Sequence, residues 1–78
     1  MVLIHAKFGM DIMDFRKVES FKLVAELQSI TKAADVLHVS QPALSRTIHQ
    51  IEKEVGAPLF DRVGRTIVLN ENGIIFLR

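Results

Sequence analysis

The first apolar pattern in the chain has the spacing of one helix face. Its members recur every three residues: Phe15, Val18, Phe21, Val24 and Leu27. This spacing predicts an amphipathic helix from Asp14 to Leu27. Asp14 can accept a hydrogen bond from a free backbone N–H, so we expect it to cap the start of this helix. Residues 1–12 show no clear period, and we expect a disordered leader or an alternative start at Met13.

A short second helix is predicted after Ser29, a residue type that favours the N-cap position. Its apolar residues are Ile30, Ala33, Ala34 and Leu37. The alanine pair is small enough to let another helix axis come close. We expect this helix to end near Leu37 and His38-Val39 to form a tight turn.

A longer third helix is predicted to begin after Ser40. Pro42 falls in its first turn, where a missing backbone N–H costs little. The residues expected on its buried face follow at helical spacing: Leu44, Ile48, Ile51 and Val55. Gly56 and Pro58 should end this helix.

The period changes after Pro58. Residues 59–62 and 66–69 are short strand-like runs around 63–65, which predicts a β-hairpin. Asn70 should cap a fourth helix that begins at Glu71. The order predicts a mostly α fold with a small β-hairpin: a winged helix-turn-helix over residues 13–69, followed at 70–78 by the start of a linker helix.

The outward face of the third helix is predicted to suit double-stranded DNA. It carries Gln41, Pro42, Ser45, Arg46 and His49, and no acidic residue lies between Ser40 and Ile51. A major groove about 12 Å wide admits one helix, and these side chains can reach base edges and phosphates. The hairpin adds Arg62 and Arg65. Two alternatives stay open: a merely solvated helix face, or a winged-helix protein-interaction module without DNA binding.

Longer motifs in the chain resemble those of LysR-type transcription regulators. They are Ser-Gln-Pro-Ala-Leu-Ser at 40–45, the preceding stretches 29–34 and 37–39, and Gly-x-x-Leu-Phe-x-Arg at 56–62. The resemblance extends from Met13 to Arg78. It implies a winged helix-turn-helix that binds an inverted-repeat operator as a dimer or tetramer. It also implies pairing of two copies through the linker helix, and a small-molecule effector bound by a C-terminal domain outside this sequence.

The resemblance also assigns the DNA contacts to positions of this chain. The start of the second helix and of the third, the outer face of the third helix, and the wing at 62–66 should carry them. The expected contact residues are Ser29, Thr31, Ser40, Gln41, Pro42, Ser45, Arg46, His49, Arg62, Arg65 and Thr66.

Three positions depart from the family pattern. Gln28 lies in a turn where glycine is common, so a left-handed residue or a different turn is needed. His49 and Gln50 stand where basic residues are frequent, which should weaken attraction to phosphates. Val68 is apolar on the side of the wing strand that should face outward.

The composition argues against metal-binding, enzymatic and membrane-spanning functions. The chain has no cysteine and three histidines, so a thiolate metal site is excluded and any metal site is poorly supplied. Ser45 and His49 share a helix face, but no orienting acid or oxyanion hole accompanies them, so we expect no enzyme activity and no cofactor.

No apolar run approaches the roughly 20 residues of a membrane span. A cytoplasmic protein is expected. The net charge of +1 requires folding to gather basic groups on one face if DNA is bound.

Overall fold

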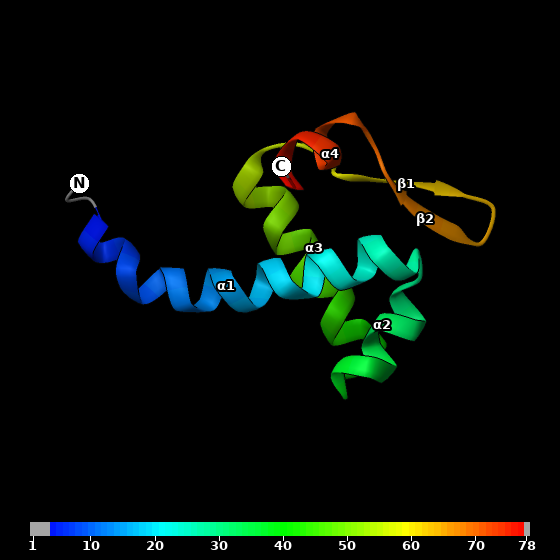
Figure 1. The fold of residues 1–78 in the computed structure, drawn as a ribbon, viewed down its shortest axis with the longest axis horizontal. Helices are drawn as coiled ribbons and strands as arrows, with labels where there is room; N and C mark the ends of the chain where they lie inside the picture. Colours follow the sequence, from blue (N-terminus) through cyan, green and yellow to red (C-terminus); the bar gives the residue numbers. More distant parts are fainter. Residues whose placement is uncertain (1–3, 78) are drawn as a thin grey trace.

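The computed structural model describes residues 4–77, with side chains from Phe15 onward. Its elements are α1 (Ile4–Leu27), α2 (Ile30–Leu37), α3 (Gln41–Val55), β1 (Phe60–Val63), β2 (Thr66–Leu69) and α4 (Glu71–Leu77). Strands β1 and β2 form an antiparallel hairpin, which we call the wing. In Figure 1 the wing extends from one end of the molecule, while the first part of α1 projects from the other. The mostly α fold with a two-stranded wing confirms the predicted architecture.

The start of α1 differs from the prediction. The helix begins at Ile4, so Asp14 lies inside it and cannot be its N-cap. The segment before Asp14 contains good helix formers such as Ala6, Lys7 and Met10, and its Ile4, Phe8 and Ile12 recur at the four-residue spacing of a helix. The predicted disordered leader is therefore helical from Ile4 on, and residues 1–3 lie outside the described part. The domain boundary at residue 13 stays a prediction.

Serine caps begin the next two helices, as predicted. The Ser29 hydroxyl oxygen accepts a hydrogen bond from the Lys32 backbone N–H at 3.1 Å, and Ser40 does the same for Ala43 at 3.2 Å. Each cap satisfies one of the backbone donors that a helix start leaves free. These bonds fix where α2 and α3 start, and therefore which side chains occupy their first turns.

The core forms where the three helices meet the base of the wing. Phe21 and Leu59 are fully buried, and the Phe21 ring centroid lies 5.0 Å from those of both Phe60 and Phe76. The rest of the buried cluster comes from all three helices and the hairpin: Val24, Ile30, Ala33, Ala34, Leu44, Ile48, Ile51 and Ile67. The inner faces of α2 and α3 are thus committed to packing, which leaves their opposite faces to solvent.

Two residues predicted in the core lie outside it. Phe15 is 64% exposed and Val55 is 43% exposed. Phe15 lies near the middle of the 24-residue α1, and Val55 is the last residue of α3. Helical spacing gives the face on which a residue lies, but the extent of the neighbouring elements decides whether that face is covered.

The hairpin turn is tighter than predicted. Val63 pairs with Thr66 and belongs to β1, so the loop consists of Gly64 and Arg65 alone. Gly64 has φ +66°, which suits the first central position of a type II′ turn, where glycine costs least. This turn places Arg65 at the tip of the wing. Val68, expected to face outward, is half-buried.

The segment before β1 connects α3, the wing and α4. The Leu59 backbone N–H donates to a Glu52 carboxylate oxygen at 2.8 Å, and the Leu59 carbonyl accepts from the Asn70 N–H at 3.0 Å. The Asn70 side chain then accepts from the Gly73 N–H at 2.9 Å, which confirms Asn70 as the cap of α4. The backbone N–H and C=O of the buried Leu59 therefore connect α3 to the start of α4.

The left-handed Gln28 provides a test of the turn between α1 and α2. Gln28 has φ +52°, its side chain is exposed, and its carbonyl accepts from the Ile67 N–H of the wing. A left-handed conformation costs a non-glycine residue about 1–2 kcal/mol. Gln28→Gly relieves this strain, but glycine also has more conformational entropy in the unfolded chain, which offsets part of the stabilisation. We therefore expect the substitution to raise the free energy of unfolding by about 0.5–1 kcal/mol.

Urea denaturation followed by circular dichroism would measure the effect. The matched control is Gln50→Gly, at an exposed position inside α3, which should lower stability by about 1 kcal/mol. Opposite signs for the same substitution are the expected result. A lower unfolding midpoint for Gln28→Gly would contradict the account of the turn.

Candidate nucleic-acid interface

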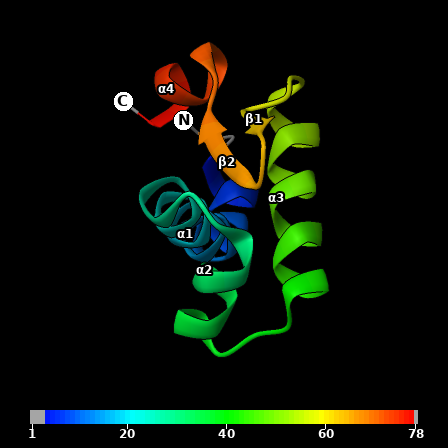
Figure 2. The ribbon, with the colours of Figure 1, turned by 90° about the vertical axis from the view of Figure 1, so that its right-hand side faces the viewer.

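The outward face of α3 is free along its length. Figure 2 shows α3 on one side of the body, with the hairpin at its C-terminal end. Leu44, Ile48 and Ile51 of α3 are buried, whereas the side chains at Gln41, Pro42, Arg46 and His49 are exposed and Ser45 is half-buried. The exposed set is the predicted reading face, and it is exposed because the apolar set faces the core.

The helix starts present a second group of predicted residues. The oxygens of Ser29 and Ser40 are occupied as caps, but each hydroxyl proton can still be donated. Thr31 is exposed in the first turn of α2. With the free N–H groups and positive dipole of a helix start, these positions suit an anionic oxygen.

A hollow between α3 and the wing brings together residues from separate segments. Its volume is about 180 Å³, and it is lined by Ile30, Ser45, Ile48, His49, Glu52, Pro58, Phe60, Arg62 and Ile67. Apolar side chains form its base, Ser45 and Arg62 supply donors, and His49 adds an imidazole ring. Of the predicted contact residues, Ser45 and His49 of α3 and Arg62 of the wing therefore share one concave surface.

The wing carries its arginines on the outside. Arg62 in β1 and Arg65 at the tip are exposed, and Thr66 beside the tip is half-buried. Within residues 15–77 the ion pair is Lys17–Glu54, between α1 and α3, so neither arginine is neutralised by a carboxylate. Two guanidinium groups on a two-stranded projection can address an anionic backbone.

Glu52 is part of this surface and was not predicted from sequence. Its carboxylate lines the hollow and accepts from the Leu59 N–H, so it holds the wing base against α3. The partner lies seven residues away and across a chain reversal. No local spacing rule points to such a contact, although an acid on an otherwise acid-free helix face is a sign that could have been noticed.

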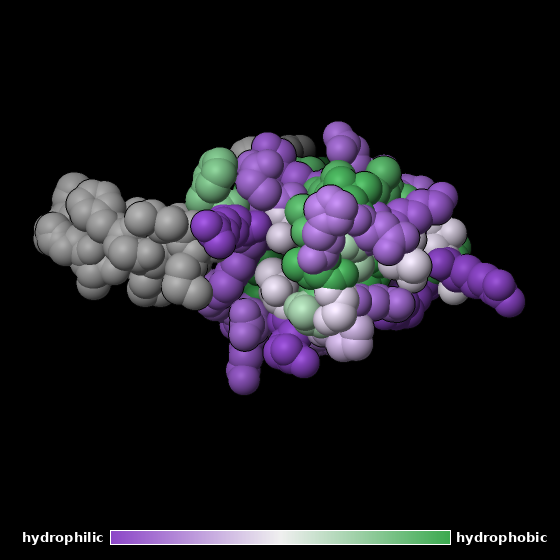
Figure 3. Space-filling view, turned by 90° about the horizontal axis from the view of Figure 1, so that it is seen from below, coloured by the Kyte–Doolittle hydropathy of each residue, from purple (hydrophilic) through white to green (hydrophobic). Residues whose placement is uncertain are grey.

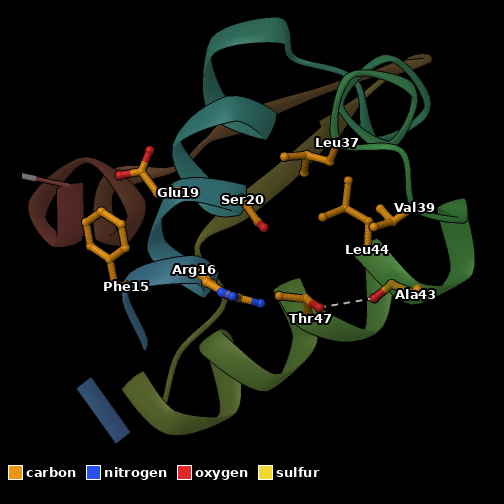
Figure 4. Close-up of a pocket in the computed structure, with 9 residues that line it drawn as sticks. All are labelled: Phe15, Arg16, Glu19, Ser20, Leu37, Val39, Ala43, Leu44 and Thr47. Atoms are coloured by element: carbon orange, nitrogen blue, oxygen red, sulfur yellow. Dashed lines mark hydrogen bonds between the residues drawn. The ribbon is translucent and has the colours of Figure 1, made fainter. Parts of the chain in front are cut away.

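A second hollow lies between α1, the turn after α2 and α3 (Figure 4). Its volume is about 280 Å³ and its lining is mainly apolar, with Leu37, Val39 and Leu44 at one side and Phe15 at the other. Figure 3, which views the molecule from below, shows an apolar area surrounded by polar side chains. None of the predicted contact residues lines this second hollow, so it is distinct from the surface formed by α3 and the wing.

Among the helices described in residues 4–77, none combines the length and apolar character needed to cross a membrane.

Comparisons with known proteins agree with this geometry. Residues 15–74 match the model of the family described as bacterial regulatory helix-turn-helix protein, lysR family. The chain is 52% identical over 66 residues to the uncharacterized HTH-type transcriptional regulator YybE of Bacillus subtilis, covering 85% of this chain and 23% of that protein. It is 44% identical over 64 residues to the regulator PcaQ of Agrobacterium fabrum, covering 82% and 21%. The chain thus spans about a fifth of the length of these relatives.

Solved structures share the fold. The crystal structure of the BenM_DBD/benA site 1 DNA complex matches with a TM-score of 0.75 and 42% identity, covering 80% of this chain and 72% of that chain. The CbnR_DBD–DNA complex matches with a TM-score of 0.76 and 40% identity, covering 81% and 72%.

Proposed function

Because the chain belongs to the LysR family of bacterial regulatory helix-turn-helix proteins, we propose that it binds double-stranded DNA sequence-specifically, with α3 in the major groove and the wing on the adjacent backbone or minor groove. The observation that carries this proposal is the exposed outer face of α3, continuous with a hollow whose far side is formed by the wing. Two solved structures with this fold, those of BenM_DBD and CbnR_DBD, are complexes with DNA.

The residues divide into two roles by reach and chemistry. Gln41, Ser45 and Arg46 lie in the first two turns of α3, where a helix in the major groove comes nearest to base edges. Ser29, Thr31 and Ser40 at the helix starts suit phosphates, and so do Arg62, Arg65 and Thr66 of the wing. Pro42 supplies an apolar surface without a competing backbone donor. His49 stands between the two groups, inside the hollow.

For the whole protein we propose a cytoplasmic transcription regulator that reads an inverted repeat as a dimer. Two recognition helices must be held about 34 Å apart, or a multiple of that, to read such a repeat. The exposed side chains of Ile74, Ile75 and Leu77 on α4 support pairing of two copies through the helix that begins there. A small-molecule effector would act through a domain outside this chain. The curated relatives are transcription regulators, and we propose no enzyme activity and no cofactor.

A protein-interaction module without DNA binding is the competing function. Such a module would present an apolar outer face on α3, whereas this face carries Gln41, Arg46 and His49. A gel shift with duplex fragments at two salt concentrations distinguishes the two. A folded chain that shifts no duplex at either concentration would contradict DNA binding.

The wing provides a quantitative test of the proposed docking. Arg65 at the hairpin tip is exposed and should meet a phosphate. We expect Arg65→Ala to lower affinity on every sequence tested and to reduce the slope of log K against log salt by about 0.9, the value for one lost phosphate contact. Fluorescence anisotropy over a salt series measures this slope. Lys22→Ala, an exposed change on α1, is the control and should leave the slope unchanged. An unchanged slope for Arg65→Ala would place the wing tip away from the backbone.

A further inference from the structure

We propose that His49 takes up a proton when the chain binds DNA, because its ring can offer a donor to a phosphate oxygen only as the imidazolium. This inference rests on the proposed DNA binding and concerns how the same surface responds to pH. It follows from one hydrogen bond and from the charges around it.

The first step is the hydrogen bond that orients the ring. The Nδ1 atom of His49 lies 3.0 Å from the backbone carbonyl oxygen of Ser45, one turn earlier in α3. A carbonyl oxygen has no proton to donate, so this contact is a hydrogen bond only when Nδ1 carries the proton. In the neutral ring Nε2 is then an acceptor, and in the cation both nitrogens are donors.

The second step is the surface that the ring shares. His49 lines the hollow together with Ser45 of its own helix and Arg62 of β1. Arg62 has only donors, so a DNA group that meets both side chains must supply acceptors. A phosphate oxygen fits this requirement. The neutral His49 ring would direct a lone pair at that oxygen, whereas the cation would donate to it.

Charged groups of both signs lie near the ring in the free chain. Glu52 lines the hollow one turn after His49, and Arg62 lines it from β1. Lys53 shares a shallow surface with His49. The remaining hollow residues contributed by α2, β2 and the segment before β1 are Ile30, Ile67 and Pro58, which do not titrate. A phosphate that binds between His49 and Arg62 adds a negative charge, and this charge favours the cation of His49 in the bound state.

The direction of the pH effect follows. Since the DNA-bound state favours protonated His49, affinity is gained as pH falls through the range in which imidazole titrates, about pH 5–8, and is lost as pH rises through it. Uptake of one proton raises the binding constant by at most about tenfold per pH unit. The added positive charge should also steepen the salt slope at low pH by about 0.9.

The experiment measures binding by anisotropy at pH 5.8, 7.0 and 8.2 over a salt series. The probe is a duplex recovered from a random-sequence pool by selection on this chain at pH 7. We expect the wild-type chain to bind more tightly at pH 5.8 than at 8.2, with the steeper slope at pH 5.8. His49→Gln should lose both effects. His49→Arg, which donates at every pH, should lose the pH dependence and bind at pH 8.2 at least as tightly as the wild type.

The other two histidines provide matched controls. His38→Asn keeps a residue type that tolerates the left-handed turn, and together with His5→Gln it should retain the pH dependence. A pH dependence that persists in His49→Gln overturns the proposal, and a pH dependence without a change of salt slope overturns the phosphate contact. Recovery of no duplex by the folded chain would instead contradict the proposed DNA binding itself.

Discussion

Replacing Arg46 by alanine is expected to weaken binding to the preferred sequence by about 1–3 kcal/mol, which is roughly 5- to 150-fold. Arg46 is exposed in the second turn of α3, beside Ser45, at the height where a major-groove helix meets base edges. A guanidinium group can donate two parallel bonds to the acceptors of a guanine, and alanine offers none. The loss of affinity should therefore depend on the identity of one base pair in the site.

A panel of duplexes, each with one base pair changed, measures this effect. The wild-type chain should discriminate at the position that Arg46 reads, and Arg46→Ala should bind all panel members alike at that position. Arg46→Lys is the informative control, because it keeps the charge but loses the planar fork. It should retain affinity for unrelated DNA and lose the discrimination. Equal weakening on every sequence would make Arg46 a phosphate contact, and no change would mean that α3 is not the reader.

The second large effect concerns stability. Alanine at Gly73 is expected to lower the free energy of unfolding by about 1–3 kcal/mol, although alanine is favoured over glycine by roughly 0.5–1 kcal/mol in most helix interiors. Gly73 is buried in α4. A Cβ there would overlap the Leu59 carbonyl oxygen and would lie 2.7 Å from the Leu69 side chain. Since that carbonyl also accepts from Asn70, the helix cannot move away without breaking its own anchoring bond.

Urea denaturation of the two neighbouring alanine variants tests this reasoning. Asn72→Ala changes an exposed residue of the same helix and should leave stability unchanged or slightly raised. The comparison removes the effect of helix propensity and leaves the packing. A Gly73→Ala chain as stable as Asn72→Ala would show that α4 does not press against the segment before β1.

The elements of this fold were largely predictable because their signals are local. Ser29 and Ser40 cap the helices that they were expected to cap, and Gly56 ends α3 with φ +88°. A cap depends on one side chain and a backbone N–H three residues on, so the sequence contains all the participants. The LysR-type motifs added a function that periodicity alone does not specify, and the comparisons confirmed both the family and the fold.

The errors occurred where distant parts of the chain decide the outcome. Phe15 and Val55 have the spacing of core residues, yet both are exposed, Phe15 beside an open hollow between α1 and α3 and Val55 at the last residue of α3. The start of α1 was missed for a different reason, because the four-residue spacing of Ile4, Phe8 and Ile12 was not recognised as helical.

By itself, then, the sequence determined the order of the helices from α2 onward, their caps, the wing and the donors on the outer face of α3. Only the tertiary structure decided that Ser45 and His49 share a hollow with Arg62, that Glu52 holds the wing through Leu59, and that Gly73 must lack a side chain. Helix and strand periods specify the directions in which side chains point from the axis of their own element. The distances between those axes are set by packing of buried side chains such as Phe21 and Leu59, which depends on all the elements together.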